Sequence, residues 1–155
     1  MLTGHWLLGL GLLAMPVGVG AHNDVPNLEL GLVGSFQVTA EISAPPATGL
    51  SLEVVETPFI DALRKRGRKI DQNNYDHVVA ADVQIASSGS QYAVALSFSY
   101  RERCVASRLK LQVMCPLWER NELLKVFSSL DDASDYVITT TKAAAKLFDA
   151  EFDRK

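Results

Sequence analysis

The segment from Tyr92 to Tyr100 constrains the fold of this chain more than any other stretch. Large side chains alternate there with small ones, so one face of an extended strand is bulky and the opposite face is made of alanine and serine. The bulky residues are Tyr92, Val94, Leu96, Phe98 and Tyr100, and the small ones are Ala93, Ala95, Ser97 and Ser99. This pattern predicts an antiparallel sheet with a layer of helices on its bulky face.

Further strands are predicted on both sides of this segment. Residues 36–42 and 79–85 alternate apolar and polar side chains with a period of two, as half-buried strands do. The run Ser87-Ser88-Gly89-Ser90 supplies the turn before the long strand. A fourth strand is predicted from Leu109, Leu111 and Val113, and a fifth from Leu124 and Val126.

Two helices are predicted to cover the sheet. The first spans about Leu50 to Arg66, with Leu52, Val55, Phe59 and Leu63 on one face and Gly67 just after its end. Pro58 leaves an alternative open, in which the helix begins at Thr57 and residues 50–56 form a strand. The second helix runs from Asp132 or Ser134 to Phe152, and its expected apolar stripe is Val137, Ala144, Leu147, Phe148 and Phe152. The fold class is therefore α+β: a two-layer sandwich of a mostly antiparallel sheet of four to five strands with two main helices.

This order of elements resembles a group of envelope proteins. Residues 49–70, which end Ala62-Leu63-Arg64-Lys65-Arg66-Gly67, look like the helix and helix exit of the TolB amino-terminal domain. The hairpin of residues 75–101 and the alanine-rich helix of residues 141–152 fit the same group, and the LpoB-type and LptE/PqiC-type envelope accessory proteins have a similar order. The chain departs from the lipoprotein members because no cysteine directly follows its apolar start, where the lipidated cysteine of a lipoprotein lies. The resemblance implies a non-catalytic role in docking on, or assembling, other envelope proteins.

The first 21 residues are typical of a secretory signal peptide. Residues 6–19 are apolar and lead into Val19-Gly20-Ala21, small residues of the kind that a signal peptidase accepts. The stretch is short and broken by glycine and proline, which disfavours a membrane span. Residues 1–5 lack the usual lysine or arginine, so a buried or membrane-anchoring helix stays the alternative. We expect a signal peptide over 1–21, a flexible lead-in over 22–34 and one α+β domain over 35–155, located in the periplasm or secreted.

Cys104 and Cys115 are the only two cysteines of the chain. An even number of cysteines in an exported protein predicts a disulfide bond, and one pair allows one connectivity. If the two residues face each other across a hairpin, the tip falls near Leu109 and Lys110. Because these are poor turn residues, a bridge across an irregular excursion is an equal alternative.

Two groups of residues are candidates for an interaction surface. Five of the six residues from Arg64 to Lys69 are basic; Arg64 to Arg66 complement a helix C-terminus, whereas Arg68 and Lys69 are open to contact with an anionic surface. The second group flanks the cysteines. Its members are Arg101, Arg103, Trp118 and Arg120. Trp118 is predicted either as an exposed aromatic anchor or as a core residue.

The sequence gives little support to catalysis or to cofactor binding. It contains no nucleophile elbow, dinucleotide-binding turn, phosphate-binding loop or zinc-protease helix. Asp76 and His77 are adjacent on an extended segment and would point to opposite faces, which disfavours an acid–base pair. Processing after Ala21 would expose His22 as a new N-terminus that could chelate copper together with His77.

The sequence therefore predicts a non-enzymatic module without a cofactor. The formal net charge of −3 disfavours nucleic acid as a partner. We expect an exported binding or adaptor protein of a bacterial cell envelope that acts through protein–protein contacts and has no stable membrane span after processing. The alternative is a periplasmic protein that binds a small ligand or copper.

Overall fold

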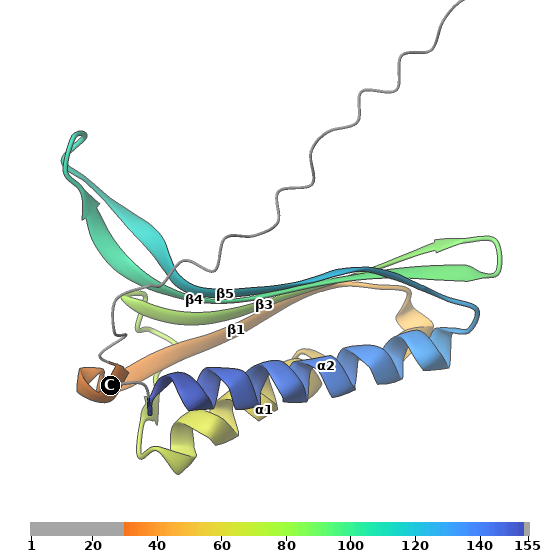
Figure 1. Cartoon of the computed structure of the whole chain (residues 1–155), viewed down its shortest axis with the longest axis horizontal. Coiled ribbons are helices and arrows are strands. Elements are labelled where there is room, and N and C mark those ends of the chain that lie inside the picture. The colour runs from red at the N-terminus through yellow and green to blue at the C-terminus, as the bar shows by residue number, and fades with distance from the viewer. Residues whose placement is uncertain (1–29, 154–155) are drawn as a thin grey trace, which may run out of the picture.

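The computed structural model describes residues 30–153, so the predicted signal peptide and His22 lie outside the described residues. After a short 3₁₀ turn at Leu30–Leu32 come β1 (Ser35–Ser43), a second 3₁₀ turn at Pro46–Thr48, α1 (Leu52–Lys65), β2 (Lys69–Ile70), β3 (His77–Ser88), β4 (Gln91–Ala106), β5 (Leu111–Phe127) and α2 (Leu130–Glu151). The five strands form one open sheet in the order β2-β1-β3-β4-β5. Both helices lie against the same face of this sheet (Figure 1). The predicted two-layer α+β sandwich is confirmed.

The sheet is mixed because of the connection through α1. The helix carries the chain back to the start of the sheet, so that β3 runs parallel to β1, and the two residues of β2 also pair in parallel with β1. The pairs β3–β4 and β4–β5 are antiparallel and joined by hairpins. The predicted fourth and fifth strands are one continuous strand, β5, which begins at Leu111; Leu109 belongs to the turn before it.

Helix α1 begins before Pro58, so the alternative start at Thr57 is wrong. The Ser51 hydroxyl caps the helix by accepting a hydrogen bond from the Val54 amide at 3.3 Å. Pro58 lies inside the helix and cannot donate to the carbonyl four residues earlier, that of Val54. Because Val54 is exposed, water can satisfy this carbonyl, which explains why the helix tolerates the proline.

Helix α2 begins at Leu130, earlier than predicted. Ser129 is its cap, and its hydroxyl accepts from the Asp132 amide at 3.1 Å while donating to the Asp132 carboxylate at 2.7 Å. The Ser-x-x-Asp spacing is that of a capping-box sequence, but the Asp132 carboxylate here accepts from the Ser129 hydroxyl and not from the Ser129 amide.

The core lies between the helices and the bulky face of β4. Val94, Leu96, Phe98 and Tyr100 are buried, as predicted, and aromatic rings link the two layers. Phe59 of α1 lies 5.7 Å from Phe98 between ring centroids, and Phe148 of α2 lies 6.1 Å from Tyr100. Four residues expected on apolar faces are instead exposed, since they lie at a helix start, at the edge of a helix stripe or on the free edge strand. These are Leu52, Leu147, Leu124 and Val126.

Candidate interaction surface

Strands β4 and β5 continue past the helices as a projecting hairpin, here called the finger (residues 101–116). Figure 1 shows this end of the sheet bending away from both helices. Tyr100 of β4 pairs with Trp118 of β5, and both pack in the core together with Leu117. An irregularity in the strand register follows directly, between Tyr100 and Arg101. Such irregularities bend a strand, so the finger leaves the plane of the sheet at the point where the helix layer ends.

A disulfide between Cys104 and Cys115 joins the two strands of the finger, which confirms the predicted bridge. In the strand register Cys104 is opposite Val113 and Cys115 is opposite Glu102, and the two cysteine Cα atoms lie 6.0 Å apart. The turn beyond them is closed by the amides of Leu109 and Lys110, which both donate to the Ala106 carbonyl. The hairpin alternative is therefore correct, and its tip lies near Leu109 and Lys110, as the sequence predicted.

The finger exposes apolar side chains on both of its faces and at its turn. Val105 and Met114 belong to the face that continues the outer face of the sheet, and Leu111 and Val113 belong to the opposite face. Leu109 sits in the turn with 69 % of its surface exposed. All five side chains are exposed, because within residues 30–153 no second layer reaches the finger. The sequence pattern did not predict this exposure, because Leu109, Leu111 and Val113 have the alternation that a buried strand would also have.

The finger is also basic. It contains Arg101, Arg103, Arg108 and Lys110 against the single acid Glu102. Its formal charge is therefore +3 in a chain whose net charge is −3, which leaves −6 for the rest of the chain. Beyond the disulfide, residues 105–114 contain two cations and no acid. Such a charge separation sets up a local positive potential at the end of an acidic protein.

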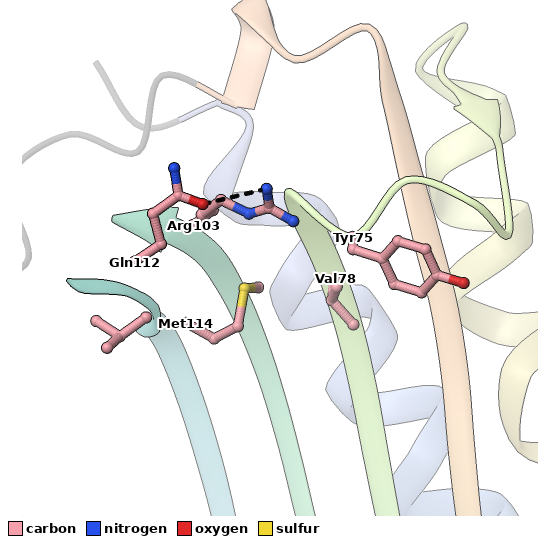
Figure 2. Close-up of a pocket in the computed structure, with 6 residues that line it drawn as sticks. Tyr75, Val78, Arg103, Gln112 and Met114 are labelled. Carbon is pink, nitrogen blue, oxygen red and sulfur yellow. Dashed lines mark hydrogen bonds between the residues drawn. The ribbon is translucent and has the colours of Figure 1, made fainter. Parts of the chain in front are cut away.

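A groove of about 380 Å³ lies at the base of the finger. In Figure 2 Arg103 and Gln112 lie on one side, Tyr75 lies on the other, and Val78 and Met114 lie between them. Its lining residues are Tyr75, Val78, Arg103, Gln112, Val113 and Met114. Most of these are apolar, and the groove is open to solvent, so an inserted side chain would bury apolar surface while its neighbours stay hydrated.

The loop before β3 fixes one wall of this groove. The Arg103 guanidinium forms an ion pair with Asp76 at 2.8 Å, and the Arg103 amide donates to the Asp76 carbonyl at 2.9 Å. Asn74 anchors the same loop to β1, since its side-chain amide donates to the Ser35 carbonyl at 2.8 Å. Arg103 is thus held in place by a carboxylate, and Arg101 is left as the nearby basic residue of β4.

The structure distributes the predicted interaction residues over three places. Arg101 and Arg103 lie at the base of the finger, on its outer face. Trp118 is half-buried beneath α2, with its ring centroid 5.4 Å from that of Phe148, and Arg120 forms an ion pair with Glu122 at 2.6 Å. The third place is the opposite edge of the sheet, where Arg68 precedes β2 and Lys69 begins it.

Acidic groups at and just beyond the end of α2 meet the basic run at the end of α1. The Arg66 guanidinium contacts the Asp149 carboxylate at 2.6 Å and the Asp153 carboxylate at 2.7 Å, and Lys65 lies 3.6 Å from Asp149. These contacts raise the pKa of Arg66 above its usual range, and the hydrogen bond from Arg66 lowers the pKa of Asp153. The ion pairs of Lys65 and Arg66 therefore link the C-terminal ends of the two helices.

Asp76 and His77 face different partners. Asp76 binds Arg103, whereas Nδ1 of His77 lies 3.0 Å from the hydroxyl of Tyr100. Burial, helped by the nearby charge of Glu102, raises the pKa of Tyr100, so its hydroxyl stays protonated and can donate to His77. Among residues 30–153 no group of three or more His, Cys, Asp or Glu side chains is placed to hold a metal ion.

No helix between residues 30 and 153 is long and apolar enough to cross a membrane. Comparison with known proteins gives neither a matching family model nor a matching curated protein. Two solved structures similar to this chain are the PelC dodecamer from Paraburkholderia phytofirmans, with a TM-score of 0.40 and 13% identity over 70% of this chain and 86% of that chain, and a substituted form of it, with a TM-score of 0.45 and 15% identity over 79% and 89%. A minor lipoprotein from Acinetobacter baumannii matches with a TM-score of 0.35 and 11% identity over 76% and 91%. At these scores the likenesses assign no family, and the resemblance to the TolB, LpoB and LptE/PqiC groups stays a prediction.

Proposed function

We propose that this protein is an exported, non-enzymatic adaptor of a bacterial cell envelope that holds a segment of a partner protein in the groove at the base of the finger. The observation that carries the proposal is the groove itself, an apolar site on an outer face that no helix of residues 30–153 covers. The signal-peptide pattern of residues 1–21 and the disulfide support export, because disulfides persist in oxidising compartments.

The chemistry of the groove favours an extended segment with an apolar anchor and acidic neighbours. Val78 and Met114 can bury the anchor, and Tyr75 and Arg103 border it. Arg101 on the outer face and the cations of the finger supply a positive rim for the flanking carboxylates. Interfaces of this kind draw most of their affinity from one buried anchor and gain partner choice from charges around it.

Site-specific photocrosslinking in intact cells tests this proposal. A benzoylphenylalanine placed at Tyr75 sits at the groove, and the same group placed at Gln91 sits in the other hairpin as a control. We expect a discrete protein adduct from position 75 and none from position 91. Replacing Val78 with aspartate puts a carboxylate in the groove, and should lower the adduct yield by about tenfold or more, as the loss of a buried anchor does. Equal yields from both positions, or no adduct from either, would refute the adaptor role.

The volume of the groove also supports a second candidate, a periplasmic binder of a small ligand. About 380 Å³ is within the range of small-molecule sites, and the side-chain amide of Gln112 offers a donor to an acidic group. The same crosslinking experiment separates the two candidates. A small ligand leaves position 75 without a protein adduct, while Val78→Asp changes the thermal shift that the ligand produces in the purified protein.

A further inference from the structure

We infer that the tip of the finger (residues 105–114) seats in an anionic membrane surface, with its apolar side chains among the lipid headgroups and its two cations bound to them. This inference goes beyond the adaptor role and does not depend on it. Gln112, Val113 and Met114 belong to both the groove and the tip, but Arg108, Leu109 and Lys110 do not line the groove and can be altered without changing it. Three features of the tip carry the inference: the placement of its apolar side chains, its charge, and its stiffness.

The apolar side chains of the tip point in too many directions for one flat partner surface. Val105 and Met114 lie on one face, Leu111 and Val113 lie on the other, and Leu109 lies in the turn between them. A flat protein surface could cover only one of these faces. A medium that surrounds the tip covers both faces and the turn together, and the headgroup region of a bilayer is such a medium.

The backbone of the finger sets the depth of this contact. A two-stranded hairpin leaves unpaired amide and carbonyl groups along its outer edges, which the hydrocarbon core of a bilayer cannot satisfy. The headgroup region contains water and polar groups that can. Residues 105–114 contain two residues of β4, the four-residue turn and four residues of β5, and the β5 part alone reaches about 13 Å at about 3.3 Å per residue. That reach is enough to cover the depth of about 5 to 10 Å at which interfacial segments lie.

The charge of the tip selects an anionic surface. Arg108 and Lys110 flank the exposed Leu109, and no acid lies between residues 105 and 114. The other basic run of the chain differs, because Asp149 and Asp153 engage Lys65 and Arg66. In the described part of the chain, the tip thus combines two cations with exposed apolar side chains and contains no carboxylate, as membrane-surface segments do.

The disulfide holds the tip in a fixed conformation before it binds. Cys104 and Cys115 close the hairpin directly below residues 105–114, so the five apolar side chains are already displayed before contact. A segment that is held in its bound shape loses less conformational entropy on binding than a flexible one. The finger can thus bind a surface although it exposes only a few apolar residues.

Vesicle flotation with the full chain tests the inference. Vesicles of equal parts phosphatidylglycerol and phosphatidylcholine should bind the parent, and vesicles of phosphatidylcholine alone should bind it much less. Each cation near an anionic surface contributes about fivefold to binding, so Arg108→Glu with Lys110→Glu should lower binding by about 25-fold or more. Leu109→Asn should lower it by about tenfold through lost apolar burial. The matched control is Ser88→Glu with Ser90→Glu at the other hairpin, which should leave binding unchanged.

A readout at the tip separates this contact from any contribution of the apolar N-terminal segment. Leu109→Trp places a fluorophore in the turn, and its difference spectrum against the parent should shift to the blue with anionic vesicles and return on adding about 0.5 M salt, which screens exposed charges. An unshifted spectrum, equal binding to both vesicle types, or equal losses in the tip and control variants would overturn the inference. A blue shift that appears only with a protein partner and never with lipid would also overturn it.

Discussion

The two hairpins of the sheet share strand β4 and differ in everything that they display. The β3–β4 hairpin turns through Ser88, Gly89 and Ser90, small polar residues with no large apolar side chain among them. The finger at the other end presents apolar side chains, cations and a disulfide. The first hairpin has a composition suited only to reversing the chain in water. The second has the composition of a contact surface, which is why we place both proposed activities at that end.

The same contrast runs along β4 itself. Residues 92–100 lie under the helices and place their bulky side chains in the core. Residues 101–106 continue beyond the helices, and no layer formed by residues 30–153 packs on them. Strand geometry is similar in both halves, so the difference in energy comes from burial and not from the backbone. Mutations can test this division directly.

The largest expected effect comes from truncating the buried half of β4. Phe98 is fully buried and packs on Phe59, so Phe98→Ala should lower the free energy of unfolding by about 3 to 5 kcal/mol, through lost transfer energy and the cavity left behind. Val105→Ala, seven residues later in the same strand, should cost less than about 0.5 kcal/mol because Val105 is exposed. Urea unfolding measures both values. Similar losses for the two variants would mean that the finger is covered by something within the chain.

Removing the disulfide should have an intermediate effect. In the chain-entropy description, a bridge between cysteines 11 residues apart contributes about 3 kcal/mol. We expect Cys104→Ala with Cys115→Ala to lower the free energy of unfolding by at most this amount, because the hairpin can open without disturbing the core. Amide exchange measures where the loss falls. Exchange should accelerate most within residues 101–117, through local opening of the finger, and within residues 92–100 by no more than the loss of global stability allows. Equal acceleration in the two segments would contradict a finger that opens independently.

The sequence predicts the buried half of the molecule well because burial leaves a periodic signature. Val94, Leu96 and Phe98 alternate with small residues, and their burial follows from the pleat of a strand. The cysteine pair likewise predicts the bridge. Both inferences use local pattern and simple chemistry, and the structure confirms them.

The exposed half is harder to predict because the exposure of a strand residue depends on where the helices that cover the sheet end. Leu111 and Val113 have the spacing of a buried strand, and only the end of the helix layer near Trp118 leaves them in solvent. The groove is equally non-local, since Tyr75 and Met114 come from segments that meet only in the folded sheet. The parallel pairing of β1 with β3 also depends on the path through α1 and not on either strand alone.

The smallest expected effect concerns the two turns, and it completes the comparison of the hairpins. Gly89 has a φ of 60° and Lys110 has a φ of 54°, a left-handed conformation that glycine adopts freely and other residues adopt at a cost of about 1 kcal/mol. A Cβ added at position 89 would meet no atom within 4 Å, so the effect of Gly89→Ala is purely conformational and should be a loss of about 1 kcal/mol. Lys110→Gly should instead relieve the finger turn and leave stability unchanged or slightly higher, while removing one cation from the tip. Thermal unfolding measures the stability of both variants, and vesicle flotation measures the effect of the lost cation on binding. If the two turns have different functions, Lys110→Gly should weaken binding to anionic vesicles about fivefold although it does not destabilise the fold. Gly89→Ala should lose stability and yet bind these vesicles like the parent.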